Sequence, residues 1–125
     1  MARLSKEVIL AALDLPLETV SVPDWGGEVL VRGMTAFERD EFEKSLMKEG
    51  DAEEGKPAKP VYDPSNMRAR LCALCMVDEN GTLLFSAADA AALGKKSGAA
   101  LDRVFQVARR LSGLGEKDLE QAVKN

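Results

Sequence analysis

The segment Val20–Glu43, VSVPDWGGEVLVRGMTAFERDEFE, constrains the fold more than any other part of the chain. Valines alternate with polar residues on both sides of a break that surrounds Trp25. The break consists of residues that commonly interrupt regular structure, namely Pro23, Asp24, Gly26 and Gly27. A two-residue period on both sides of such a break predicts a β-hairpin, which we expect over Thr19–Val22 and Glu28–Arg32.

A helix is predicted directly after this hairpin. Thr35 and Glu38 match the capping box, in which each side chain accepts a hydrogen bond from the free backbone N–H of the other residue. We expect the helix over residues 36–48. Because it has few apolar side chains, it should lie at the surface with a narrow buried seam.

The N-terminal stretch MARLSKEVILAALDL also has a helical pattern. Ser5 is a suitable N-cap, and Val8, Ile9, Ala12 and Leu13 fall on one face. An acidic residue interrupts the apolar run and no cleavage-site pattern closes it, so we expect an amphipathic helix and not a signal peptide. No apolar run in the sequence approaches the roughly 20 residues that a membrane-spanning helix needs.

The composition changes at residues 49–64, EGDAEEGKPAKPVYDP. This stretch contains three prolines, two glycines and only two large apolar residues. It buries too little apolar surface to offset the entropy of ordering it. We therefore expect a flexible loop here, of which Gly50–Pro60 is dispensable for folding and is cut first by proteases, near Lys56 or Lys59.

Two later segments are predicted to form the core. Met67–Val77 has little polar surface and is expected to be the central helix, so that Leu74→Asp should be severely destabilising. Ser97 is the expected N-cap of the most amphipathic helix, over Ser97–Leu111. The apolar stripe of that helix consists of Leu101, Val104, Phe105, Ala108 and Leu111.

Shorter elements are expected around these two helices. The sequence DENG predicts a turn, and Leu83–Phe85 is a candidate for a short strand. Ser86 and Asp89 repeat the capping-box pattern before a helix that should end near Gly94. Residues 114–125 are expected to form a short, mobile C-terminal helix.

The residues that usually carry chemistry are sparse. The chain has no histidine, which removes the commonest general base and the commonest metal ligand. Cys72 and Cys75 form a Cys-x-x-Cys pair, but they lie in a continuous apolar segment and no second Cys or His pair accompanies them. Core packing is therefore the favoured interpretation, with a redox pair and shared metal binding as the alternatives. We expect no enzymatic activity, no cofactor and no bound metal.

Charge and the single tryptophan bear on the partner. The formal net charge is −4, which argues against nucleic acid or an anionic membrane, since both need dense positive charge on the protein. Trp25 is a candidate partner-contact anchor, because tryptophan is enriched at interface hot spots. The favoured interpretation is that its indole folds back over the hairpin or the first helix.

Three segments resemble, in pattern and order, the tail assembly chaperones of long-tailed, siphovirus-type bacteriophages or prophages. They are Val20–Glu43, VDENGTLLF at 77–85 and ALGKKSGAALDRVFQVARRLSGL at 92–114. The resemblance implies a binding protein that holds the tape measure protein in the host cytoplasm, assists tail tube assembly and is absent from the finished virion. It also implies a homo-oligomer and, in many phages, an extended frameshift form that recruits the tail tube protein. It supplies no catalytic residues.

We therefore expect a single α+β domain over residues 1–125, mainly α-helical, with its N-terminal hairpin packed on the two core helices. The candidate partner-binding residues are Trp25, Leu114, Leu119 and Val123, the last three as exposed contacts near the C-terminus. An alternative function is that of a small structural or adaptor protein of the head–tail or tail apparatus, which would remain in the virion. A bacterial regulatory module is a further alternative.

Overall fold

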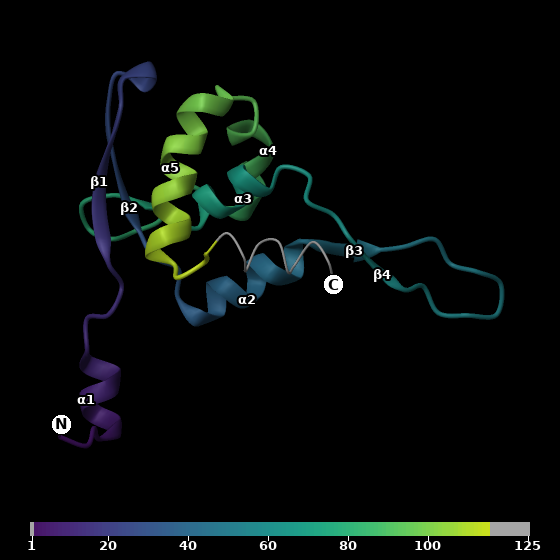
Figure 1. Ribbon diagram of the computed structural model, residues 1–125, viewed down its shortest axis with the longest axis horizontal. Coiled ribbons are helices and arrows are strands. Elements are labelled where there is room, and N and C mark those ends of the chain that lie inside the picture. The colour runs from purple at the N-terminus through teal and green to yellow at the C-terminus, as the bar shows by residue number, and fades with distance from the viewer. Residues whose placement is uncertain (1, 116–125) are drawn as a thin grey trace.

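A computed structural model describes residues 2–115 as a three-stranded sheet covered on one face by helices, with two projections (Figure 1). One projection is an N-terminal helix and the other is a two-stranded hairpin. The elements in chain order are α1 (Lys6–Ala11), β1 (Leu17–Val22), β2 (Gly27–Arg32), α2 (Ala36–Ser45), β3 (Met47–Glu49), β4 (Pro60–Tyr62), α3 (Met67–Ala73), β5 (Met76–Val77), α4 (Ala90–Leu93) and α5 (Gly98–Leu111). Short 3₁₀ turns lie at Pro23–Trp25 and Ala87–Asp89.

The predicted N-terminal hairpin is confirmed. Strands β1 and β2 pair in antiparallel fashion with Val20 opposite Val29, and the 3₁₀ turn at Pro23–Trp25 joins them. Gly26 closes this turn in the left-handed conformation, with φ of 80°, which glycine adopts without a steric penalty. Because side chains alternate along a strand, Val20, Val22 and Val31 point to one face, where they are buried.

Helix α5 covers this buried face and forms the centre of the fold with α3. The predicted cap is confirmed, since the Ser97 hydroxyl accepts a hydrogen bond from the backbone N–H of Ala100 at 3.3 Å. The predicted stripe is also confirmed, as its members are buried except for Leu111, which is half-buried. Helix α5 contacts both β1 and β2 on one side and α3 on the other. The core is therefore one cluster shared by the sheet, α5 and α3.

Two predicted helices are shorter than expected, because strands begin where the sequence continued the helical pattern. The central helix ends at Ala73, and Met76–Val77 forms β5, in which Val77 pairs with Leu30 and Met76 with Val31. The prediction of a helix to Val77 is wrong because a short apolar run fits a buried strand as well as a buried helix. The other helix ends at Ser45, before β3. In place of the expected strand Leu83–Phe85, the structure has a single β-bridge between Val77 and Leu83.

The junction between β2 and α2 contains the predicted capping box. The Thr35 hydroxyl accepts a hydrogen bond from the Glu38 N–H, and the Glu38 carboxylate accepts one from the Thr35 N–H. Arg32, at the end of β2, adds two hydrogen bonds of 2.8 and 2.9 Å to the same carboxylate. Burial raises the pKa of Glu38, but the hydrogen bonds from Arg32 and Thr35 outweigh it and hold the pKa below its usual range.

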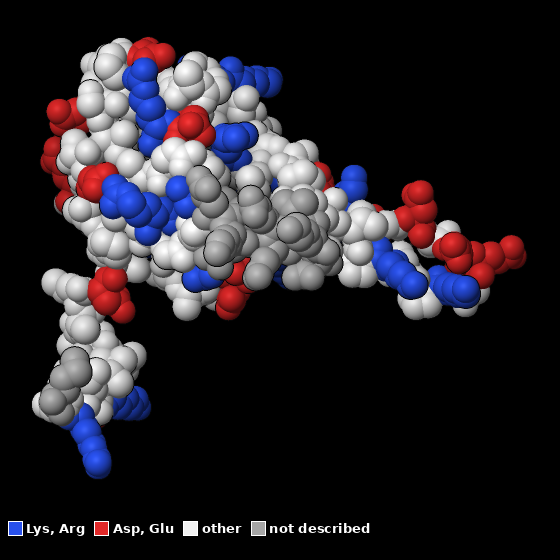
Figure 2. Space-filling view, viewed as in Figure 1, with Lys and Arg blue, Asp and Glu red and all other residues white. Residues whose placement is uncertain are grey.

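The segment expected to be a flexible loop has regular structure at its ends. Strands β3 and β4 pair with Met47 opposite Tyr62, and they carry an exposed tip between them. We call this hairpin, Met47–Tyr62, the finger. It projects from the body, and its tip carries charges of both signs (Figures 1 and 2). The mobility of residues 49–64 stays a prediction.

The α+β class is confirmed, and the description as mainly helical is only loosely supported. Helices account for 41% of the structure and strands for 18%. Strands β3 and β5, which the sequence analysis counted as helix, reduce the helical share. The hairpin packs on α5 as predicted, whereas α3 lies behind α5, in contact with α5 and α4.

Leu71, and not Leu74, lies at the centre of the core, because Leu71 is fully buried and Leu74 is only half-buried. Leu71→Ala should lower the free energy of unfolding by about 3 kcal/mol, through lost transfer energy and a cavity. Leu74→Ala should cost about 1 kcal/mol, because its site is already open on one side. Urea unfolding followed by circular dichroism measures both values, and equal losses would contradict this placement.

Between residues 17 and 115, the tip of the finger should be the first site of proteolysis. Prolines follow both Lys56 and Lys59, and trypsin cleaves poorly before proline, so a glutamate-specific protease is the suitable probe. Cleavage should occur first after Glu53 or Glu54, which are exposed. Glu43, in the last turn of α2, serves as the internal control, and cleavage there at an equal rate would contradict an open tip.

Candidate functional site

The described residues hold no arrangement that suggests catalysis or a metal centre. No group of three acidic or sulfur side chains within residues 2–115 converges to hold an ion. Cys72 and Cys75 are free thiols buried in the core, which confirms their predicted place. Burial raises the pKa of both thiols, that of Cys75 to about 11, so neither is a reactive thiolate near neutral pH.

Trp25 lies at the tip of the β1–β2 hairpin and is half-buried against the core cluster. The favoured interpretation, in which the indole folds back over the hairpin, agrees with this position. An ion pair between Asp24 and Arg103, of 3.1 Å, joins the same turn to α5. The role of Trp25 as a partner contact stays a prediction.

The C-terminal candidates divide into two groups. Leu114 is 4% exposed and belongs to the core cluster, so the prediction of an exposed Leu114 is wrong. It is turned inward because Gly113, with φ of 73°, ends α5 and reverses the chain. Leu119 and Val123 lie outside the described residues.

The largest exposed apolar element is one that the sequence analysis did not select. We call residues 2–16 the arm. They contain α1, which has no buried residue, and six of the ten large hydrophobic side chains that are exposed within residues 2–115. These six are Leu4, Val8, Ile9, Leu10, Leu13 and Leu15. Figure 1 shows the arm standing apart from the sheet and the other helices.

The base of the arm is attached to the sheet, whereas the rest of the arm is exposed to solvent. The Pro16 carbonyl accepts a hydrogen bond from the Gly33 N–H at 3.0 Å, which ties the chain to the end of β2. Ser5 caps α1 as predicted, through its hydroxyl and the Val8 N–H. The periodicity predicted a helix here correctly, but the helix is only six residues long, and because Ala12 is extended, Ala12 and Leu13 do not share the expected face with Val8 and Ile9. The periodicity could not show that the apolar face has no partner within the described chain, because docked and undocked helices share the same pattern.

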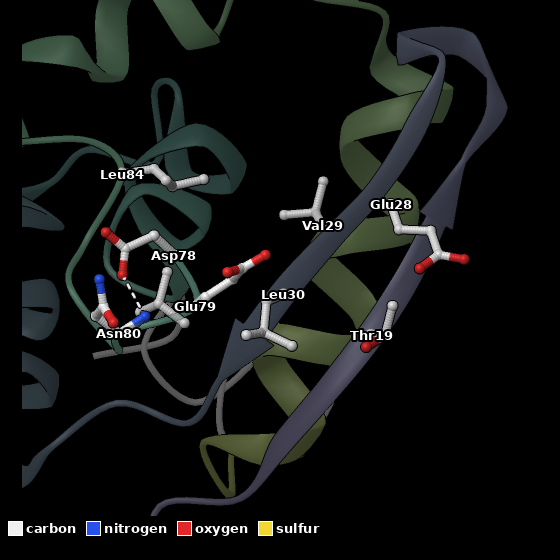
Figure 3. Close-up of a pocket in the computed structure, with 9 residues that line it drawn as sticks. Thr19, Glu28, Val29, Leu30, Asp78, Glu79, Asn80 and Leu84 are labelled. Atoms are coloured by element: carbon white, nitrogen blue, oxygen red, sulfur yellow. Dashed lines mark hydrogen bonds between the residues drawn. The ribbon is translucent and has the colours of Figure 1, made fainter.

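A second feature is an open groove on the sheet face opposite α5, with a volume of about 550 Å³. Its lining residues come from β1, β2, β5 and the loop after β5 (Figure 3). Leu30 and Leu84 supply its apolar surface, Val77 lies buried at its floor, and Glu28, Asp78 and Glu79 add carboxylates. We call this the sheet groove. The sequence feature that could have indicated this groove is Leu30, an apolar residue that shares a strand face with the charged Glu28 and Arg32.

The sheet groove carries negative charge that the rest of the described chain does not neutralise. No Lys or Arg lines it. Asp78 is engaged locally, since its carboxylate accepts hydrogen bonds from the backbone N–H groups of Asn80 and Thr82. None of the ion pairs among residues 2–115 involves Glu28 or Glu79. The groove therefore suits a ligand with apolar and basic groups.

The arm and the sheet groove are the candidate surfaces for protein–protein contact among residues 2–115. Contiguous exposed apolar surface of this kind marks interaction sites in proteins. Within residues 2–115 no helix combines the length and the apolar character that crossing a bilayer demands.

Comparison with known proteins gives one match. A family model described as phage tail assembly chaperone matches residues 5–125. No curated protein and no solved structure matches the chain.

Proposed function

Because the chain belongs to the family of phage tail assembly chaperones, we propose that it holds the tape measure protein during tail assembly. The family is one of chaperones and not of enzymes, and its members act with phage tail proteins. The single observation that carries the finer proposal is the arm, whose apolar side chains have no partner among the described residues.

The arm suits an apolar helical client. Its exposed side chains Val8, Ile9 and Leu10 lie on α1, and the exposed Leu4 and Leu13 lie just outside the helix, beyond the Ser5 N-cap and the extended Ala12. An amphipathic helix with such anchors packs against another apolar helical face. The tape measure protein is a long, aggregation-prone client, and several copies of this chain would cover several of its apolar segments. Trp25, Leu119 and Val123 are proposed as further contacts.

The same proposal includes the circumstances of binding. The chaperone acts in the host cytoplasm before the tail is complete, and it leaves as tube subunits assemble, so that it is absent from the virion. The free chain forms a homo-oligomer. The tail tube protein is recruited by an extended frameshift form. The rival function, a structural or adaptor protein, requires instead that the chain be present in purified particles.

Co-expression with the tape measure protein tests the proposal. The wild-type chain should raise the soluble fraction of the tape measure protein several-fold. The double variant Val8→Glu/Leu13→Glu should lose most of this effect, because it places charges on the apolar face of the arm. It should fold normally, since both side chains are more than half exposed. Soluble and insoluble fractions on gels give the measurement.

Phe37→Glu is the matched control. Phe37 is 73% exposed on α2, outside the arm and the sheet groove, so this variant removes an exposed apolar side chain without touching either surface. It should solubilise the client as well as the wild type does. Equal solubility of the client with and without the chain, at matched expression, would exclude the chaperone function. Full activity of the arm variant would exclude the arm as the contact.

A further inference from the structure

We propose that the arm of one copy docks in the sheet groove of a second copy. The inference deepens the self-association included in the proposed function and rests on that function for its biological role. Its geometry rests on two surfaces of the described chain that have no partner there, one a projecting apolar helix and the other an open groove.

The apolar parts of the two surfaces match. The arm presents Leu10 and Leu13 at 75% and 103% exposure, which means that they have almost no contact with the rest of the chain. The sheet groove presents Leu84, itself 51% exposed, on the loop after β5, and Leu30 on β2, with Asp78 and Glu79 between them (Figure 3). Its volume of about 550 Å³ has room for several side chains. Docking would remove both patches from water together.

The charges match at one end of the arm. Arg3 and Lys6 lie toward its free end, and Figure 2 shows basic side chains there and an otherwise mostly uncharged surface. Glu28 and Glu79, at the groove, make no ion pair within residues 2–115. Docking with the free end at these carboxylates pairs opposite charges. It also gives the arm a direction, because Arg3 lies at the free end and Asp14 nearer the body, while Glu7 directly follows Lys6.

The arm is poorly placed to fill the groove of its own copy. To do so, it would have to reverse direction between α1 and β1 and fold back across the sheet. Pro16 restricts the chain there, keeps Leu15 extended, and is held by its hydrogen bond to Gly33. No glycine precedes Gly26 in the sequence, so the stretch lacks the residue that most readily permits a tight reversal. A second copy meets no such restriction.

The interface is heterologous, because arm and groove are different patches of one copy. Two copies can satisfy both by exchanging arms, and otherwise copies link head to tail. In either arrangement, each contact needs one intact arm and one intact groove on different chains. Mutations can therefore disable the arm on one chain and the groove on another, and test the two halves of the contact separately.

Complementation between two defective variants tests it. Leu84→Glu blocks the groove and keeps the arm, and Val8→Glu/Leu13→Glu disables the arm and keeps the groove. Light scattering after size-exclusion chromatography should show a self-associated wild type and each variant alone as a monomer. Mixing the two variants should give a 1:1 heterodimer, since one arm and one groove remain. Phe37→Glu should associate like the wild type.

Charge reversal gives a second measurement. Lys6→Glu and Glu79→Lys should each raise the dissociation constant of the self-associated state several-fold. Combined in one chain, they should restore most of the affinity, because the pairing is recreated with opposite signs. Circular dichroism should show every variant folded, because all the substituted side chains are exposed.

Several outcomes would overturn the proposal. A wild type that is monomeric at every attainable concentration would mean that the arm folds on its own copy or stays free. A mixture of the two variants that stays monomeric, or a groove variant that still associates, would place the contact elsewhere. The client assay separates these failures from failure of the proposed function. Leu84→Glu should still solubilise the tape measure protein, because its arm is intact.

Discussion

The burial of the α5 stripe between the sheet and α3 is the interaction on which the rest of the structure depends. Val104 and Ala108 are fully buried there, with Val22 and Val31 on the sheet side. The chain has few aromatic residues, so a cluster of small and medium apolar side chains must hide this surface together. Because α5 covers one face of the three-stranded sheet, the part of the other face around Thr19, Glu28 and Leu30 stays open, although Val77 on β5 is buried. The sheet groove is thus a consequence of the core architecture.

The end of α5 also fixes the path of the chain from the sheet into α2. Gly33 passes so close to this end that a Cβ there would lie 2.4 Å from the Leu111 carbonyl oxygen, and only glycine avoids the clash. The next residue, Met34, donates its N–H to the Ser112 hydroxyl at 3.0 Å. The Gly33 N–H binds the Pro16 carbonyl at the base of the arm. One crossing point therefore sets the positions of β2, α2 and the arm.

Local signals in the sequence predicted those elements whose ends are set by short-range chemistry. The capping box at Thr35 and Glu38, the cap at Ser97 and the turn around Trp25 each involve neighbouring residues, and each was found as predicted. Met76–Val77 was missed because its strand character comes from pairing with β2, more than 40 residues earlier in the sequence. Leu114 was misplaced for a related reason, since its burial depends on a chain reversal after α5. The apolar pattern of the arm predicted the helix but not its end at Ala11, and periodicity carries no information on whether a face finds a partner.

An exposed apolar helix is a liability that a chaperone must manage, because the surface that captures a client also promotes aggregation. Docking the arm in the groove of another copy would satisfy both needs, provided that the contact is weaker than the one with the client. A difference of about 1.4 kcal/mol in binding free energy shifts the occupancy tenfold, so a modest preference for the client suffices. The groove contributes three carboxylates in addition to its apolar residues, and charged rims are screened by salt and contribute little affinity. This composition favours a contact that is specific in direction and readily exchanged, which is what the proposed function requires.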